Sequence, residues 1–232
     1  MGLGKTLQSL CVVLNESYLA YKRTGVKPIS LIVCPTSITH NWHAEVHKFF
    51  SVSGFTSEVY EGTSTQKGDI LSRAKAKKFD VLVVSYEKLR NDVKQFLEVE
   101  FFYAILDEAH IIKNSKAKIT LAVKQLKCDK KLILTGTPLQ NRVSELWSIF
   151  DFLLPGFLEE ENVFNRKYNQ YLTTNIKKLS EKLEETQSFV DALKSLKKRI
   201  EPFVLRRTKL EVLKELPPKV IQDVLCKMSP FQ

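Results

Sequence analysis

The sequence predicts an α/β fold built on a doubly wound parallel sheet. Short runs that are nearly all apolar and rich in β-branched residues indicate strands covered on both faces. The longer stretches between them carry apolar residues at helical spacing, and strands that alternate with helices favour a parallel sheet. The expected strands are residues 31–34, 81–84, 103–107 and 132–135.

The helical pattern is clearest in two places before the strand pattern stops. Leu7, Leu10, Cys11 and Leu14 mark one helix, and Trp42, Val46, Phe49 and Phe50 mark another. After Pro155-Gly156, residues 158–200 are polar, charged and helical in period, which predicts a helical protrusion. We therefore divide the chain into a sheet domain (1–155), the protrusion (156–200) and a connector (201–232) with a strand-like run at 220–225.

Composition limits the function classes. The chain has 232 residues, of which 44% are hydrophobic, enough for one α/β domain with an appendage. A net charge of +10 fits a polyanionic partner such as nucleic acid, although a lysine-rich surface without function gives the same balance. Four cysteines without CxxC spacing predict neither a disulfide framework nor a zinc site. No apolar run is long enough for a membrane span, and no secretory signal is visible.

The chain opens with the closing half of a phosphate-binding loop. Gly2 and Gly4 let backbone N–H groups approach phosphate oxygens, and the following helix directs its positive end at them. Lys5 can reach the β- and γ-phosphates, and the Thr6 hydroxyl can ligate Mg²⁺. We expect a nucleotide site here that also includes Leu7. A glycine-rich turn ahead of a helix is the alternative for this motif alone.

Ile105-Leu-Asp-Glu-Ala-His110 brings two adjacent carboxylates to the end of a hydrophobic strand. Asp107 is placed to hold Mg²⁺ through water, and Glu108 to orient or deprotonate an attacking water. The pair favours a catalytic site over an ordinary acidic surface. We expect His110 to connect this strand to the next motif by a hydrogen bond, beside the nucleotide.

Further polar motifs follow the other expected strands. They are Pro35-Thr36, Ser85-Tyr86 and Thr135-Gly136. Ligands of doubly wound sheets bind outside the carboxyl ends of the strands. All of these motifs should therefore lie at one edge of the sheet, together with Asp107 and Lys5.

In their order along the chain, several motifs together resemble the first RecA-like lobe of the Swi/Snf-type ATPases. They are GLGKT, CPTSITHNW, VVSYEKLR, DEAHIIKN, LTGTPLQN, ELWSIFDFLLPG and FVLRR. These ATPases are DNA translocases of helicase superfamily two, and the resemblance covers essentially the whole chain. It implies the P-loop NTPase fold, ATP and Mg²⁺ as cofactors, and double-stranded DNA as a partner. FDFLLPGFL and LPPKVIQDVLCKMSPFQ are most similar to the Mot/BTAF subgroup, which strips the TATA-binding protein from DNA, so we expect nuclear localisation.

The resemblance assigns roles residue by residue. Lys5 and Thr6 become nucleotide contacts, and Asp107 with Glu108 becomes the Mg²⁺ and hydrolysis pair. The DNA-side motifs comprise Pro35, Thr36, Ser37, Trp42, Ser85 and Tyr86. Thr135, Gly136 and Thr137 match the motif that couples the nucleotide and DNA sites.

The family also has residues before the loop and a second lobe whose arginines complete the ATP site. The resemblance therefore implies a chain that begins inside its nucleotide loop, binds ATP poorly alone and hydrolyses essentially none. Two hypotheses follow: the ATP-binding lobe of a DNA translocase, or a non-catalytic fragment that binds DNA or partners. An RNA helicase of the DEAH kind is a third, which Thr-Gly-Thr-Pro and the helical insert disfavour.

Other polar clusters have simpler interpretations. His40, His43 and His47 indicate a solvated helix face and not a metal site. Lys75–Lys78 and Lys130-Lys131 are expected to be exposed charges. Trp147, Phe150 and Phe152 are expected in the core. Arg206-Arg207 fits a salt bridge or helix cap as well as a nucleic-acid contact.

Overall fold

The computed structural model describes residues 2–136, 143–172, 183–212 and 222. The chain forms two compact units, residues 1–190 and 191–232, and the sheet lies in the first. The second contains the end of helix α10 (Leu183–Ile200), a 3₁₀ turn at Glu201–Phe203 and the short helix α11 (Lys209–Val212). The functional boundaries predicted at residues 155 and 200 remain a proposal.

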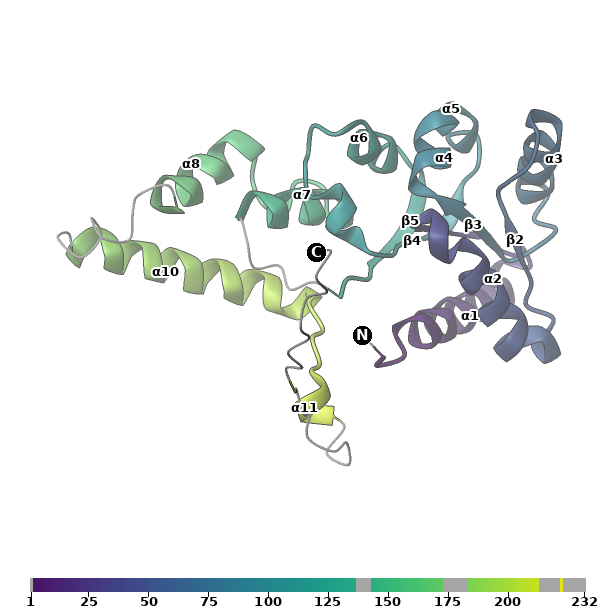
Figure 1. The fold of residues 1–232 in the computed structure, drawn as a ribbon, viewed down its shortest axis with the longest axis horizontal. Helices are drawn as coiled ribbons and strands as arrows, with labels where there is room; N and C mark the ends of the chain where they lie inside the picture. Colours follow the sequence, from purple (N-terminus) through teal and green to yellow (C-terminus); the bar gives the residue numbers. More distant parts are fainter. Residues whose placement is uncertain (1, 137–142, 173–182, 213–221, 223–232) are drawn as a thin grey trace, which may run out of the picture. The chain divides into compact units, whose positions relative to one another are not determined.

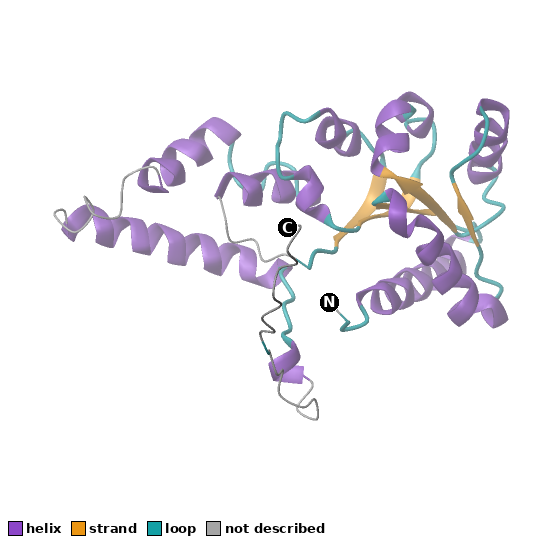
Figure 2. Cartoon of the chain, in the orientation of Figure 1, coloured by secondary structure: helices purple, strands orange, loops and turns teal. Residues whose placement is uncertain are grey.

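Five parallel strands form one sheet in the order β2-β3-β1-β4-β5 (Figures 1 and 2). Their bounds are β1 Ser30–Cys34, β2 Ser57–Val59, β3 Val81–Ser85, β4 Phe101–Leu106 and β5 Cys128–Ile133. In the register of the central strands, Cys34 lies opposite Ser85, and Val33 lies opposite Leu106. The carboxyl ends of β3, β1 and β4 therefore lie side by side.

Helices cover both faces of the sheet, which confirms the doubly wound fold (Figure 1). One face is covered by α1 (Lys5–Thr24) and α2 (Thr39–Phe50). The other face is covered by α3 (Ser64–Lys75), α4 (Tyr86–Asn91), α5 (Val93–Phe96), α6 (Lys118–Lys124) and α7 (Val143–Leu153). Side chains alternate along β1, so Leu31 and Val33 enter one core while Ile32 and Cys34 enter the other.

The outer strands differ from prediction. β2 was not predicted, because three residues with a charged centre carry too little periodic signal. β5 begins at Cys128, four residues earlier than the expected start at residue 132, and none of its residues is fully buried. The expectation that every strand is covered on both faces is therefore wrong for β5. Lys130 and Lys131 belong to this strand and are only partly exposed.

Between residues 161 and 200, the residues that the structure describes are helical. Helix α8 (Glu161–Leu172) packs against α7, and α10 follows. The strand-like run at 220–225 lies outside the described residues, apart from position 222. Within the described ranges, no helix combines the length and apolar character needed to cross a membrane.

Candidate nucleotide and DNA site

Four of the predicted motifs begin at the carboxyl edge of the sheet. Pro35 follows β1, Ser85 ends β3, and Asp107 follows β4. Thr135 lies two residues beyond the end of β5, and its partner Thr137 is outside the described residues. Because the strands are parallel, this places the four motifs at one edge, as the sequence predicted.

The glycines of the opening loop have the backbone geometry that such a loop requires. Gly2 has φ 82° and Gly4 has φ 72°, values that L side chains rarely adopt. Gly4 caps the start of α1, where its carbonyl accepts from the amide of Gln8 at 3.0 Å. The first turn of α1 contains no acidic residue, so its amides meet no competing negative charge there. Lys5, Thr6 and Leu7 follow in this turn, all half-buried.

Asp107 is held by hydrogen bonds to both its carboxylate and its main chain. The Trp42 indole Nε1 donates to Oδ2 at 3.0 Å, and the Glu108 amide donates to Oδ1 at 2.9 Å. The Tyr86 hydroxyl donates to the main-chain oxygen of Asp107 at 2.9 Å. The main-chain N–H of Asp107 donates to Val33 of the neighbouring strand at 2.8 Å. The carboxylate is therefore fixed in position at the strand end.

Burial and hydrogen bonding act on the pKa of this carboxylate in opposite directions. Burial raises the pKa of Asp107 above its usual value, whereas the hydrogen bonds from Trp42 and Glu108 lower it. The negative charge of Glu108 raises the pKa further, and the positive charge of Lys5 lowers it. The positive charge of Lys5 is thus one of the influences on the pKa of Asp107, as expected if the two predicted motifs share a site.

Glu108 has a strained backbone. Its φ of 51° and ψ of 50° place it in the left-handed region, where a residue other than glycine costs about 1–2 kcal/mol. Its side chain contacts Nδ1 of His110 at 3.2 Å, so His110 bonds to the acidic pair itself. We predicted a bond from His110 to the next motif. That bond stays a prediction, because most of the next motif lies outside the described residues. The main chain also links the two strand ends, since Ala109 N–H donates to Leu134 at 3.1 Å.

The DNA-side residues fall into two groups. Thr36 and Ser37 are exposed and Pro35 is half-buried, and the Thr36 hydroxyl donates to Glu87 of α4 at 2.9 Å. The side chains of Trp42, Ser85 and Tyr86 are buried, at no more than 2% exposure. A ligand on the surface can therefore reach the first group directly but not the second.

Ser85 and Cys34 are the last residues of β3 and β1, and both are buried. The Ser85 hydroxyl accepts from the amide of Lys88 at 3.3 Å and so caps α4. Burial, with the charges of Asp107 and Glu87, raises the pKa of the Cys34 thiol to about 12. Cys34 is thus a neutral thiol beside the carboxylates and not a nucleophile.

The remaining clusters have structural explanations. The described residues contain no group of three or more His, Cys, Asp or Glu side chains placed to hold a metal ion. His43 lies against His47, with ring centroids 4.4 Å apart, and its Nδ1 is 2.8 Å from the Ser57 hydroxyl. Phe150 and Phe152 are buried as predicted, whereas Trp147 is only half-buried. Arg206 and Arg207 are exposed.

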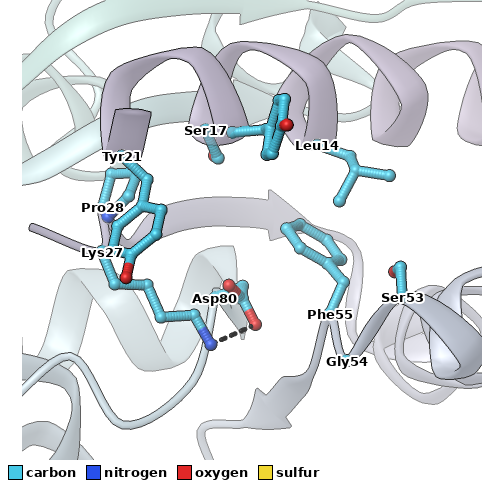
Figure 3. Close-up of a pocket in the computed structure, with 10 residues that line it drawn as sticks. Leu14, Ser17, Tyr21, Lys27, Pro28, Ser53, Gly54, Phe55 and Asp80 are labelled. Atoms are coloured by element: carbon cyan, nitrogen blue, oxygen red, sulfur yellow. Dashed lines mark ion pairs between the residues drawn. The ribbon is translucent and has the colours of Figure 1, made fainter. Parts of the chain in front are cut away.

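A cavity of about 410 Å³ lies away from these motifs (Figure 3). It is lined by Leu14, Tyr18 and Tyr21 of α1, by Phe55, and by the ion pair of Lys27 with Asp80 at 3.0 Å. Lys27 and Asp80 precede β1 and β3, so the cavity lies at the amino ends of these strands. It is therefore distinct from the edge that carries Asp107.

Comparison with known proteins identifies the family. Residues 1–232 match the SNF2-related domain. The chain belongs to the SNF2-related family. It superposes on the Sulfolobus solfataricus SWI2/SNF2 ATPase core solved in complex with double-stranded DNA, with a TM-score of 0.72 and 35% identity. That match covers 100% of this chain and 44% of the solved chain.

Curated SNF2-related relatives include proteins associated with the TATA-binding protein. The chain is 42% identical over 239 residues to human TATA-binding protein-associated factor 172. It is 40% identical over 239 residues to TATA-binding protein-associated factor MOT1 of Saccharomyces cerevisiae. Both alignments cover 100% of this chain but 13% and 12% of those proteins, so the chain spans about an eighth of their length. The predicted resemblance to the Swi/Snf-type ATPases and to the Mot/BTAF subgroup is confirmed.

Proposed function

We propose that this chain is the ATP-binding lobe of an ATP-dependent translocase on double-stranded DNA. The observation that carries the proposal is the fixed Asp107–Glu108 pair at the end of β4, within electrostatic reach of Lys5. An acidic pair beside a phosphate loop is the arrangement that positions a nucleoside triphosphate and an attacking water. The membership of the SNF2-related family supports ATP as that nucleotide.

The residues present fit Mg²⁺. The metal prefers hard oxygen ligands and keeps several of its waters. Asp107 offers a carboxylate whose two oxygens each accept one hydrogen bond from the protein, which leaves lone pairs for a hydrated ion. Thr6 offers a hydroxyl in the first turn of α1. When bound, Mg²⁺ would neutralise charge that develops on the phosphates.

The chain's own groups would divide the work of hydrolysis. Lys5 and the amides after Gly4 bind the phosphates, and Asp107 orients the hydrated ion. Glu108 accepts the proton of the attacking water at its carboxylate, next to His110. Arginines from a second lobe would complete the site in the whole protein.

DNA would bind at the Pro35–Ser37 turn, where Thr36 and Ser37 are exposed, and at the neighbouring end of α4. Hydroxyls and main-chain amides of this kind contact phosphate oxygens without reading the base sequence. The relatives named for association with the TATA-binding protein favour that protein as the displaced target, and a nuclear location follows from it.

The test uses the full-length product of the gene. We expect DNA-stimulated ATP hydrolysis and ATP-dependent release of the TATA-binding protein from a TATA-containing duplex. Glu108→Gln should bind ATP and lose both activities. Glu100→Gln, an exposed glutamate just before β4, is the matched control and should keep them. Equal turnover by Glu108→Gln and the wild type would refute the assignment.

A further inference from the structure

Two buried aromatic side chains from different elements direct their polar atoms at Asp107. Trp42 lies on α2, which follows β1, and Tyr86 is the first residue of α4, which follows β3. Trp42 bonds the carboxylate, at 3.0 Å, and Tyr86 bonds the main-chain oxygen, at 2.9 Å. Asp107, at the end of β4, is thereby hydrogen-bonded to residues from the helices that follow β1 and β3.

Packing alone does not explain the polar atoms. A phenylalanine ring would fill the Tyr86 site with nearly the same volume and would fill only part of the Trp42 site. In either site it would leave an oxygen of Asp107 without its donor. A buried acceptor that loses its donor is costly, so the indole N–H and the phenol O–H have a specific task here. An indole N–H can only donate, which makes it a partner for a carboxylate oxygen in every state of the site.

The second contact also restrains Glu108. The peptide group between Asp107 and Glu108 has its oxygen bonded to Tyr86 and its N–H bonded to Asp107 Oδ1. With both polar atoms held, the plane of this peptide cannot rotate freely. That plane precedes the left-handed backbone of Glu108, so Tyr86 helps to keep Glu108 in its strained conformation.

We propose that Trp42 and Tyr86 are positioning residues that hold the Asp107 carboxylate and the following peptide in the geometry that binds the Mg²⁺–ATP complex. The inference rests on the proposed function, and it assigns the two side chains to the part of the ATP site that would hold Mg²⁺. It also accounts for the burial of these two residues, which the sequence placed among the DNA-side motifs. Groups that orient a metal-binding side chain commonly change metal affinity by about 10–100-fold when they are removed.

The experiment measures ATP affinity by calorimetry with the full-length product, at a series of Mg²⁺ concentrations and with ATP in EDTA. The variants are Trp42→Phe, which replaces the indole by a smaller ring without a donor, and Tyr86→Phe, which removes one donor and keeps the ring. Trp147→Phe is a matched control, because its indole N–H donates to Leu158 and Glu159 main-chain oxygens at 3.0 Å. Tyr60→Phe is the second control, because its hydroxyl bonds Asp92 and Gln95.

Mg²⁺ is expected to tighten ATP binding, and half of this effect is reached at a certain Mg²⁺ concentration. We expect Trp42→Phe to raise that concentration about tenfold. The affinity for ATP in EDTA should not change. Tyr86→Phe should act in the same direction by a smaller factor, and both controls should match the wild type. If Trp42→Phe does not fold, Tyr86→Phe decides, since it lacks only one oxygen. Unchanged Mg²⁺ dependence in the folded variants would overturn this inference alone. A wild type that does not bind Mg²⁺–ATP would overturn the proposed function and this inference with it.

Discussion

Lys130 of β5 and Glu16 of α1 form an ion pair that ties the outer strand of the sheet to the helix after the phosphate loop. The Lys130 ammonium also lies 5.0 Å from the ring centre of Phe102 and 5.6 Å from that of Tyr103. We predicted Lys130 to be an exposed charge, but the residue is only partly exposed, so that prediction is wrong. A lysine in an edge strand is half-buried here because its stem and its charge both have partners.

Replacement of Lys130 should therefore destabilise the sheet edge. Lys130→Ala removes a cation–π contact worth about 0.5–1 kcal/mol and also frees Glu16. Lys127→Ala, at an exposed position just before β5, should change stability little. Urea unfolding of both variants measures the difference, and equal midpoints would show that the contacts of Lys130 contribute nothing.

Lys5→Ala should weaken ATP binding more than it slows the hydrolysis of ATP already bound. The substitution removes the charge that faces the phosphates, and a charge-assisted contact of this kind is worth about 1.5–3 kcal/mol. Titration of the full-length product with ATP measures the loss. An affinity equal to that of the wild type would place the phosphates elsewhere.

Glu108→Asn should stabilise the fold while it abolishes turnover. Asparagine adopts the left-handed region more readily than other non-glycine residues, so part of the strain at φ 51° is relieved. We expect a gain of about 0.5–1 kcal/mol over Glu108→Gln, which keeps the strain and also lacks the base. Thermal unfolding of the two variants compares them directly. Equal stabilities would mean that the backbone of Glu108 is not strained in solution.

Stability should fall in mild acid because of His43. Burial, with the charges of His47 and His40, lowers the pKa of His43 below its usual 6.5, although Glu61 opposes the shift. The folded state therefore binds this proton less readily than the unfolded state, and stability is lost as the pH falls through 6.5 towards the folded pKa. His43→Gln should reduce the difference in Tm between pH 7.5 and pH 5.5. The same difference in both proteins would assign the acid sensitivity to other groups.

DNA binding should be governed by phosphate contacts. We expect affinity to fall steeply as salt rises, because each phosphate contact releases counterions, and to depend little on base sequence. Binding of mixed-sequence duplexes by the full-length product at about 50 and 200 mM salt spans the range in which the loss is large. Affinity that rose with salt, or that changed strongly with sequence, would contradict the proposed mode of binding.

The sequence predicted the central sheet and the edge at which its motifs lie, because buried parallel strands contain unbroken apolar runs such as residues 81–84. It did not predict β2, whose three residues are too few to show a period. It also placed Trp42 and Tyr86 among DNA-side residues. The period of α2 puts Trp42 in a stripe with Val46 and Phe50, which indicates burial, but only the fold shows that its N–H meets Asp107.

That contact gives the chain an intrinsic optical probe. The sequence contains two tryptophans, so Trp147→Phe leaves the indole of Trp42 as the sole source of tryptophan emission. Because this indole donates directly to Asp107 Oδ2, we expect its emission spectrum to respond to a change in the charge at that carboxylate. The arrival of a cation at Asp107 can thus be followed by fluorescence in real time, without a label and without turnover.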